Sequence, residues 1–192
     1  KTQIANEGYE NTSLPDSFFD AAIGNVPFGQ FKVPDKRYDK HNFLIHDYFF
    51  ARTLDKVRPG GVIAFITSKG TLDKENPNVR KYIAQRADLL GAIRLPNDTF
   101  KAAAGTEVTS DIIFLQKRDR LVDANGIRMN AYFVDNPEMV LGDMQMVSGP
   151  HGMESACIAY ENAELGDLLR DAIQNIHAEI TEFEIDDLEA ED

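Results

Sequence analysis

Residues 46–70 read HDYFFARTLDKVRPGGVIAFITSKG, and this stretch decides the fold class of the chain. A helix is predicted over residues 42–57, and it ends at the Pro/Gly stop of residues 58–61. Its apolar residues recur at spacings that a helix places on one side: Phe43, Phe50, Leu54 and Val57. The run VIAFIT, residues 62–67, is continuous and apolar. Such a run is typical of a strand buried on both faces of a parallel sheet.

The segments on either side of this stretch repeat the alternation of strand and helix. A strand is predicted over residues 20–24, before the helix of residues 42–57. A second helix opens at Asn76-Pro77 and runs to about Ala87. Two further strands are predicted over residues 89–95 and 106–116. The order predicts an α/β sheet that closes with an antiparallel hairpin.

The pattern changes after Arg118, so we predict that residues 1–118 form the sheet domain and residues 119–180 a small α+β appendage. A strand is expected over residues 127–134, a short helix start at Asn136-Pro137, and a hairpin within residues 143–160. A helix is expected over residues 163–180. Its predicted apolar stripe is Leu165, Leu168, Leu169, Ile173 and Ile176. Residues 181–192 are predicted to be an acidic tail.

Composition narrows the class of protein. The 192 residues contain one cysteine, Cys157, which excludes an internal disulfide and a cysteine-rich zinc site and favours a reducing cytoplasm. No apolar run approaches the ~18 residues of a membrane span. The net charge of −12 divides into +3 for residues 1–118 and −15 for residues 119–192. Only the first part could therefore lie against a polyanion such as DNA, because the second part would repel it. Because the chain does not open with methionine, we expect a fragment of a larger protein.

The sharpest chemical signal is Asn25-Val26-Pro27-Phe28, directly after the first predicted strand. Sites in open α/β sheets form at the carboxyl ends of strands. There the turn can hold a carboxamide oxygen, a backbone carbonyl and an aromatic face, which together suit a planar substrate that carries an exocyclic amine. A structural turn with Phe28 in the core is the alternative.

The motif resembles the Asn/Asp-Pro-Pro-Phe/Tyr sequence of amino methyltransferases that use S-adenosylmethionine. Residues 46–73 and 89–118 are similar, in order and spacing, to the segments that follow this motif in N6-adenine DNA methyltransferases, among them the modification subunits of type I restriction systems. Residues 130–144 resemble large helicase–methylase fusion proteins of phages and conjugative elements. The resemblance covers roughly residues 16–118 and implies the second half of a Rossmann-like methyltransferase sheet.

The resemblance implies a role for each matching residue. The Asn25 side-chain oxygen and the Val26 carbonyl would accept hydrogen bonds from the adenine amine. Phe28 would stack on one face of a base turned out of the duplex, and Phe100 would cover the other. The family has proline where this chain has Val26, which loosens the turn but keeps the carbonyl.

The same resemblance implies S-adenosylmethionine as the cofactor of a complete domain. The glycine-rich turn that holds it does not precede Asn25, so its site is incomplete in this chain and its binding residues are unknown. Expected partners are therefore DNA, the missing first half of the domain and a helicase region of the same polypeptide, and no membrane. We expect the chain alone to be inactive and to bind the cofactor weakly or not at all.

Three basic residues are candidate contacts to DNA. Lys36 and Arg37 lie in a loop with interleaved aromatic residues and would bind phosphates of the target strand. Lys69 follows the buried strand and would line the base pocket. Solvated surface residues are the alternative. Histidine spacing indicates no metal site.

Two other functions stay open. The motif also suits a methyltransferase that acts on RNA or on a glutamine side chain of a protein. Alternatively, Val26 and the acidic C-terminal part suit a degenerate, non-catalytic scaffold with a methyltransferase fold.

Overall fold

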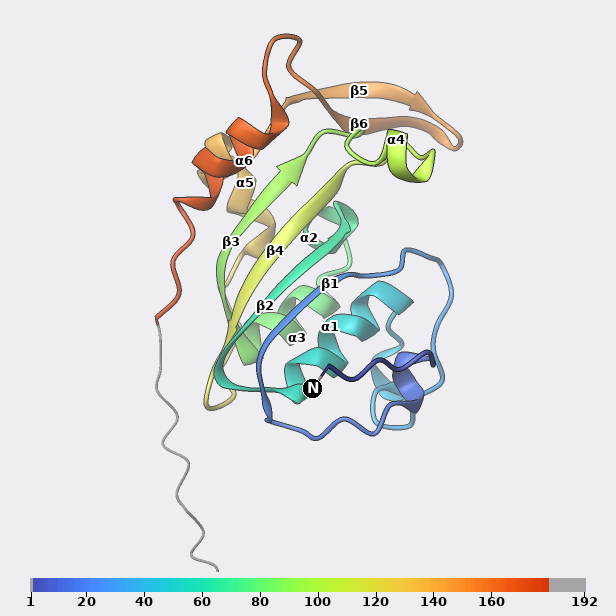
Figure 1. Cartoon of the computed structure of the whole chain (residues 1–192), viewed down its shortest axis with the longest axis vertical. Coiled ribbons are helices and arrows are strands. Elements are labelled where there is room, and N and C mark those ends of the chain that lie inside the picture. The colour runs from blue at the N-terminus through green and yellow to red at the C-terminus, as the bar shows by residue number, and fades with distance from the viewer. Residues whose placement is uncertain (1, 180–192) are drawn as a thin grey trace, which may run out of the picture.

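The computed structural model describes residues 2–179, and they fold around a four-stranded mixed sheet (Figure 1). The strands lie in the order β1-β2-β4-β3, with β1 and β2 parallel and β4 antiparallel to both of its neighbours. The predicted α/β sheet with a terminal antiparallel pair is confirmed. The strands are β1 (Phe19–Asn25), β2 (Val57–Ser68), β3 (Ala87–Leu95), β4 (Ser110–Lys117), β5 (Asp143–Gly149) and β6 (Gly152–Ile158).

Two helices cover one face of this sheet. These two helices are α1 (Ile45–Lys56) and α3 (Asn78–Arg86). The other helices of the described residues are α2 (Gly70–Asp73), α4 (Lys101–Ala104), α5 (Tyr132–Asp135) and α6 (Leu165–Ile173). Short 3₁₀ turns occupy Tyr9–Asn11, Asp39–His41, Met129–Ala131 and Pro137–Met139. The apolar residues predicted for α1 enter the core that α1, α3 and the sheet share, where Phe50 and Leu54 are fully buried. The helix predicted over residues 42–57 is therefore confirmed, with the bounds Ile45–Lys56.

The opposite face of the sheet is only partly covered, which corrects the prediction that residues 62–67 are buried on both sides. Ile63 and Phe65 are buried under the helices, whereas Val62 and Ala64 on the other face are half-buried. β1 lies at the edge of the sheet, and its Ile23 is 86% exposed. The reason is that α6 and its neighbours pack near β3 and β4 and do not extend to β1.

The C-terminal part packs on the sheet through a second apolar cluster. Ile93 and Leu95 of β3 meet Met139, Leu141 and Ala172. The hairpin β5–β6 is confirmed, and the short turn after Asn136 is a 3₁₀ helix. The observed α6 is shorter than the predicted helix.

The strand predicted over residues 127–134 is wrong, because this segment forms a 3₁₀ turn followed by α5. Met129 packs into the core under the helices, while Tyr132 and Phe133 reach the second apolar cluster as well. The proposed division of the chain at residue 118 stays a prediction. The acidic tail of residues 181–192 lies outside the described residues.

Candidate target-base site

Asn25 is the last residue of β1, at the carboxyl end of the sheet where the sequence predicts a site. It pairs in register with Ile66 of β2, and the Val26 N–H donates to the Ile66 carbonyl at 3.0 Å. The Val26 side chain is 3% exposed and packs in the core. The ladder and this buried side chain hold the turn in place although it lacks the family's second proline.

The two predicted hydrogen-bond acceptors are unengaged. Among residues 2–179, neither the Asn25 carboxamide nor the Val26 carbonyl accepts a hydrogen bond. Asn25 and Pro27 are exposed, and Phe28 is 40% exposed. Phe28 therefore presents part of its ring to solvent instead of filling the core. The exposed Asn25 carboxamide next to an exposed aromatic ring can bind a planar ligand that carries an amine, whereas Val26 as a whole is buried.

Phe100 does not contact Phe28. It lies between β3 and α4, is half-buried and packs with the cluster around Ile93 and Leu95. β1 and β3 are three positions apart in the sheet, a separation of about 14 Å at the usual strand spacing. The structure thus places Phe28 and Phe100 at the same end of the sheet but on different strands.

Lys69 follows β2 at the same end, but its amine is engaged. Lys69 Nζ donates to the Ser155 carbonyl at 2.5 Å and to Ser155 Oγ at 2.7 Å. Ser155 belongs to β6, so Lys69 binds the C-terminal hairpin.

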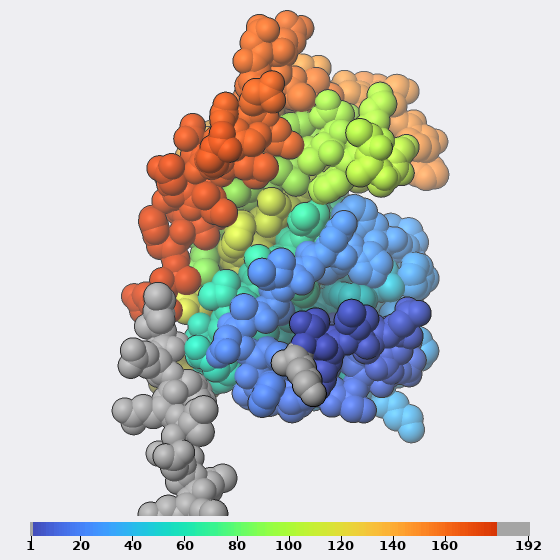
Figure 2. All heavy atoms as spheres, viewed as in Figure 1, coloured from blue at the N-terminus to red at the C-terminus, as the bar shows by residue number. Residues whose placement is uncertain are grey.

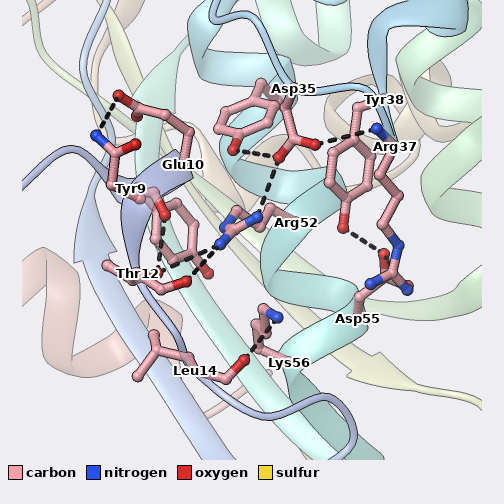
Figure 3. Close-up of polar contacts among 12 residues, drawn as sticks. Tyr9, Glu10, Thr12, Leu14, Asp35, Arg37, Tyr38, Arg52, Asp55 and Lys56 are labelled. Carbon is pink, nitrogen blue, oxygen red and sulfur yellow. Dashed lines mark hydrogen bonds and ion pairs between the residues drawn. The ribbon is translucent and has the colours of Figure 1, made fainter.

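Arg37 lies at the other end of the sheet from Asn25. Its guanidinium binds Asp16 at 2.7 Å and Asp55 at 3.1 Å. Figure 3 shows Arg37 beside Asp55. Asp16 precedes β1, and the Asp55 carbonyl accepts a hydrogen bond from the Ser17 N–H, which puts both acids at the amino end of β1. β1 spans about 20 Å. The structure does not bring Arg37 to the candidate site, and the exposed Lys36 lies beside it in the chain.

A buried polar cluster around Arg52 organises this distant end, and no motif or spacing in the sequence predicts it. Arg52 donates to an Asp35 carboxylate oxygen at 3.0 Å and to the Thr12 carbonyl at 2.9 Å (Figure 3). The Tyr48 hydroxyl donates to the same Asp35 oxygen at 2.8 Å. Burial and the Asp35 carboxylate raise the pKa of Tyr48, so its hydroxyl stays protonated. The cluster ties the N-terminal segment and the loop after β1 to α1.

A second buried ion pair lies near the candidate site. Arg94 of β3 donates to both carboxylate oxygens of Asp111 of β4, at 2.8 and 2.9 Å, and also contacts Asp73 at the end of α2. Burial alone would lower the pKa of Arg94, but the Asp111 and Asp73 carboxylates raise it. A charged Arg94 thus joins β3, β4 and α2 at the end where Asn25 lies.

The described residues do not fit S-adenosylmethionine. The family's glycine-rich turn lies between a strand and a helix, whereas Gly24 lies inside β1 and Gly60-Gly61 lie inside β2. Within residues 2–179, no group of three His, Cys, Asp or Glu side chains is arranged to hold a metal ion. No helix of that part of the chain is long and apolar enough to span a membrane.

Comparisons with known proteins agree with the predicted resemblance. A stretch of 109 residues is 36% identical to the Defense against restriction protein B of Escherichia phage P1. The match covers 55% of this chain and 5% of that protein. The chain therefore spans about one twentieth of this relative. Among solved structures, the EcoKI M protein of a type I restriction enzyme matches at 17% identity, with a TM-score of 0.44 over 60% of this chain and 25% of that chain.

A further structure is described as a class I S-adenosylmethionine-dependent methyltransferase from Listeria monocytogenes. It matches at 24% identity, with a TM-score of 0.44 over 57% of this chain and 35% of that chain. The sequence model of the family described as N-6 DNA Methylase matches residues 2–143, which is well over half of the chain. The chain belongs to the N-6 DNA methylase family.

Proposed function

We propose that this chain is the target-adenine-binding part of an S-adenosylmethionine-dependent N6-adenine DNA methyltransferase within a larger protein. The observation that carries the proposal is the end of β1, where the exposed Asn25 carboxamide accepts no hydrogen bond from residues 2–179 and lies three residues before the exposed Phe28. Family membership supports the same reaction class.

The residues would act by binding and orienting the base. The exocyclic amine of adenine has two N–H groups, which match one side-chain and one backbone acceptor. Phe28 would stack on the ring of a base that has left the duplex. Acceptors held in place by the β1–β2 ladder orient the nitrogen without reorganising, which is the usual source of electrostatic preorganisation.

The cofactor would come from a segment outside the described residues. S-adenosylmethionine supplies the methyl group in this class of enzyme, and no glycine-rich turn of the required kind lies next to β1. The other edge of β1 has no strand partner among residues 2–179, so it offers a place for the rest of a larger sheet. The helicase region expected from residues 130–144 stays a prediction.

The test is methyl transfer by a polypeptide in which residues 1–192 are joined to the cofactor-binding segment. Unmethylated DNA is incubated with labelled S-adenosylmethionine, and N6-methyladenine is measured by mass spectrometry. We expect methylated adenine, with a loss of at least about a hundredfold in rate for Asn25→Ala, because that change removes one of the two acceptors. RNA and protein substrates are assayed in parallel.

Each other outcome selects an alternative. Methylation of RNA or of a glutamine side chain, with DNA left unmodified, would replace the DNA reaction by a related one. No transfer to any substrate from a folded protein that binds the cofactor would favour the non-catalytic scaffold.

A further inference from the structure

Strand β6 lies across the carboxyl end of the sheet and binds three separate segments there (Figure 1). The Cys157 N–H donates to Thr109 Oγ1 at 2.9 Å, and the Asn97 N–H donates to the Cys157 carbonyl at 2.8 Å. Lys69 Nζ donates to the Ser155 carbonyl and hydroxyl. Thr109 precedes β4, Asn97 follows β3 and Lys69 follows β2. β6 therefore joins the ends of three strands.

The bonds leave from one edge of β6. Cys157 and Ser155 are two residues apart, so their backbone groups point to the same side of the strand, away from β5. The Cys157 side chain is fully buried, and burial raises the pKa of its thiol to about 11. The backbone bonds of Cys157 thus fix the outer edge of β6 at residue 157, and Lys69 binds the same edge at Ser155.

Two of the segments that β6 joins carry residues predicted for the target-base site, namely Lys69 and Phe100. Residues 96–109 form the loop that carries Phe100, and Lys101–Glu107 of this loop are exposed. Lys69 is three residues beyond Ile66, whose carbonyl accepts the Val26 N–H. Figure 2 shows the yellow-green atoms of the α4 region directly above the blue atoms of the segment after β1, with the light orange hairpin above and behind them.

Polar bonds and two buried side chains hold the hairpin at this end of the sheet, since Ala156 and Cys157 of β6 are 6% and 0% exposed. A two-stranded hairpin is marginally stable by itself in water, and Met146 and Met153 are 61% and 65% exposed. A cavity of about 240 Å³ lies between the hairpin and residues 107–109. No Lys or Arg lies between Arg128 and Arg170, which makes the hairpin unsuited to grip phosphates.

We propose that Lys69 is a positioning residue, which holds β6 across the end of the sheet so that β6 holds the Phe100 loop in the arrangement that receives the target adenine. Apart from its first residue, Asp143, the hairpin lies beyond residues 2–143, the part that matches the family. The inference rests on the proposed function of Asn25 and Phe28 and on the predicted role of Phe100.

The experiment compares Lys69→Met, Lys69→Arg and the matched control Lys81→Met, which changes an exposed lysine of α3. Amide hydrogen exchange of the 192-residue chain reports whether the loop of residues 96–109 loosens. Fluorescence anisotropy then measures binding of a single-stranded oligonucleotide with one adenine and of the same strand with purine in its place. The ratio of the two affinities reports how well the amine is held.

For Lys69→Met we expect roughly tenfold faster exchange in residues 96–109, because a hydrogen bond from a charged group is lost. The preference for adenine should fall several-fold, Lys69→Arg should restore it, and Lys81→Met should match the unchanged chain. Thr109→Val, which removes the acceptor of the Cys157 N–H, should give the same two changes if Lys69→Met fails to fold.

Two results would overturn the proposal, and they differ from each other. If Lys69→Met and Thr109→Val keep the full preference for adenine while Asn25→Ala abolishes it, the target site does not need the hairpin. If the unchanged chain binds adenine and purine strands equally, the proposed function of Asn25 fails, and this inference fails with it.

Discussion

Arg94 and Asp111 face each other across β3 and β4 as a buried, two-point ion pair. They are register partners, and Arg94 Nε and Nη2 each donate to one Asp111 oxygen, at 2.8 and 2.9 Å. The Arg94 guanidinium also lies 4.4 Å from the centre of the Phe133 ring. This pair connects the sheet, α2 and the C-terminal part at the end where the candidate site lies.

Replacing Arg94 by Met should lower the free energy of unfolding by about 3–5 kcal/mol, because it leaves the Asp111 carboxylate buried without its partner. Urea unfolding followed by circular dichroism measures this. The double variant Arg94→Met with Asp111→Leu should recover much of the loss. A change below about 1 kcal/mol in the single variant would contradict the account of a tightly bound buried pair.

The sequence predicted the elements whose pattern is local. The spacing of Phe50 and Leu54 predicted α1, and the apolar run of residues 62–67 predicted the second part of β2, which already begins at Val57. The insertion of β4 between β2 and β3 follows from packing and leaves no trace in the order of elements. A strand is predicted over residues 127–134, yet Met129 is buried in the core under the helices and Phe133 packs against both apolar clusters, and that packing overrides the prediction.

The candidate site shows the same limit. Asn25 and Phe28 could be placed from the motif, because a strand end positions them directly. The contacts of Arg37 could not, since Asp16 and Asp55 lie far from it along the chain in opposite directions. The same holds for Lys69, whose partner Ser155 lies 86 residues away.

Arg52→Lys should destabilise the chain by about 1–3 kcal/mol, although it keeps the charge. A lysine cannot reach the Asp35 carboxylate and the Thr12 carbonyl together, as the planar guanidinium does. The exposed Arg120 offers the control substitution Arg120→Lys. Thermal and urea unfolding of both variants would measure the difference, and equal stabilities would contradict the role given to Arg52.

Acid should weaken the fold through His46. Burial lowers the pKa of His46, and Lys74 lowers it further against the opposing effect of Asp47. The folded chain therefore binds fewer protons than the unfolded chain below the ordinary histidine pKa of about 6.5, so stability is full above that pH and falls as the pH drops through it. His46→Phe should flatten the decline in unfolding free energy between about pH 7 and 5. An unchanged slope would show that His46 does not cause it.

Lys36 and Arg37 should differ in DNA binding despite being neighbours. Arg37 is held by Asp16 and Asp55, whereas Lys36 is exposed. If the loop touches a phosphate, Lys36→Ala should reduce the slope of log affinity against log salt by about 1, and Arg37→Ala should leave it unchanged. Titrations at several salt concentrations in a complete domain test this. A reduced slope for Arg37→Ala alone would assign the phosphate contact to Arg37 instead.

The central claim is that Asn25 and Val26 hold the exocyclic amine of adenine. The most direct measurement is the affinity of the chain for a single-stranded oligonucleotide with one adenine, compared with the same strand in which purine, which lacks the amine, replaces it. We predict a preference for adenine of roughly tenfold, which Asn25→Ala reduces to near one. Equal affinities for the two strands in the unchanged chain, or a preference that survives Asn25→Ala, would contradict the account.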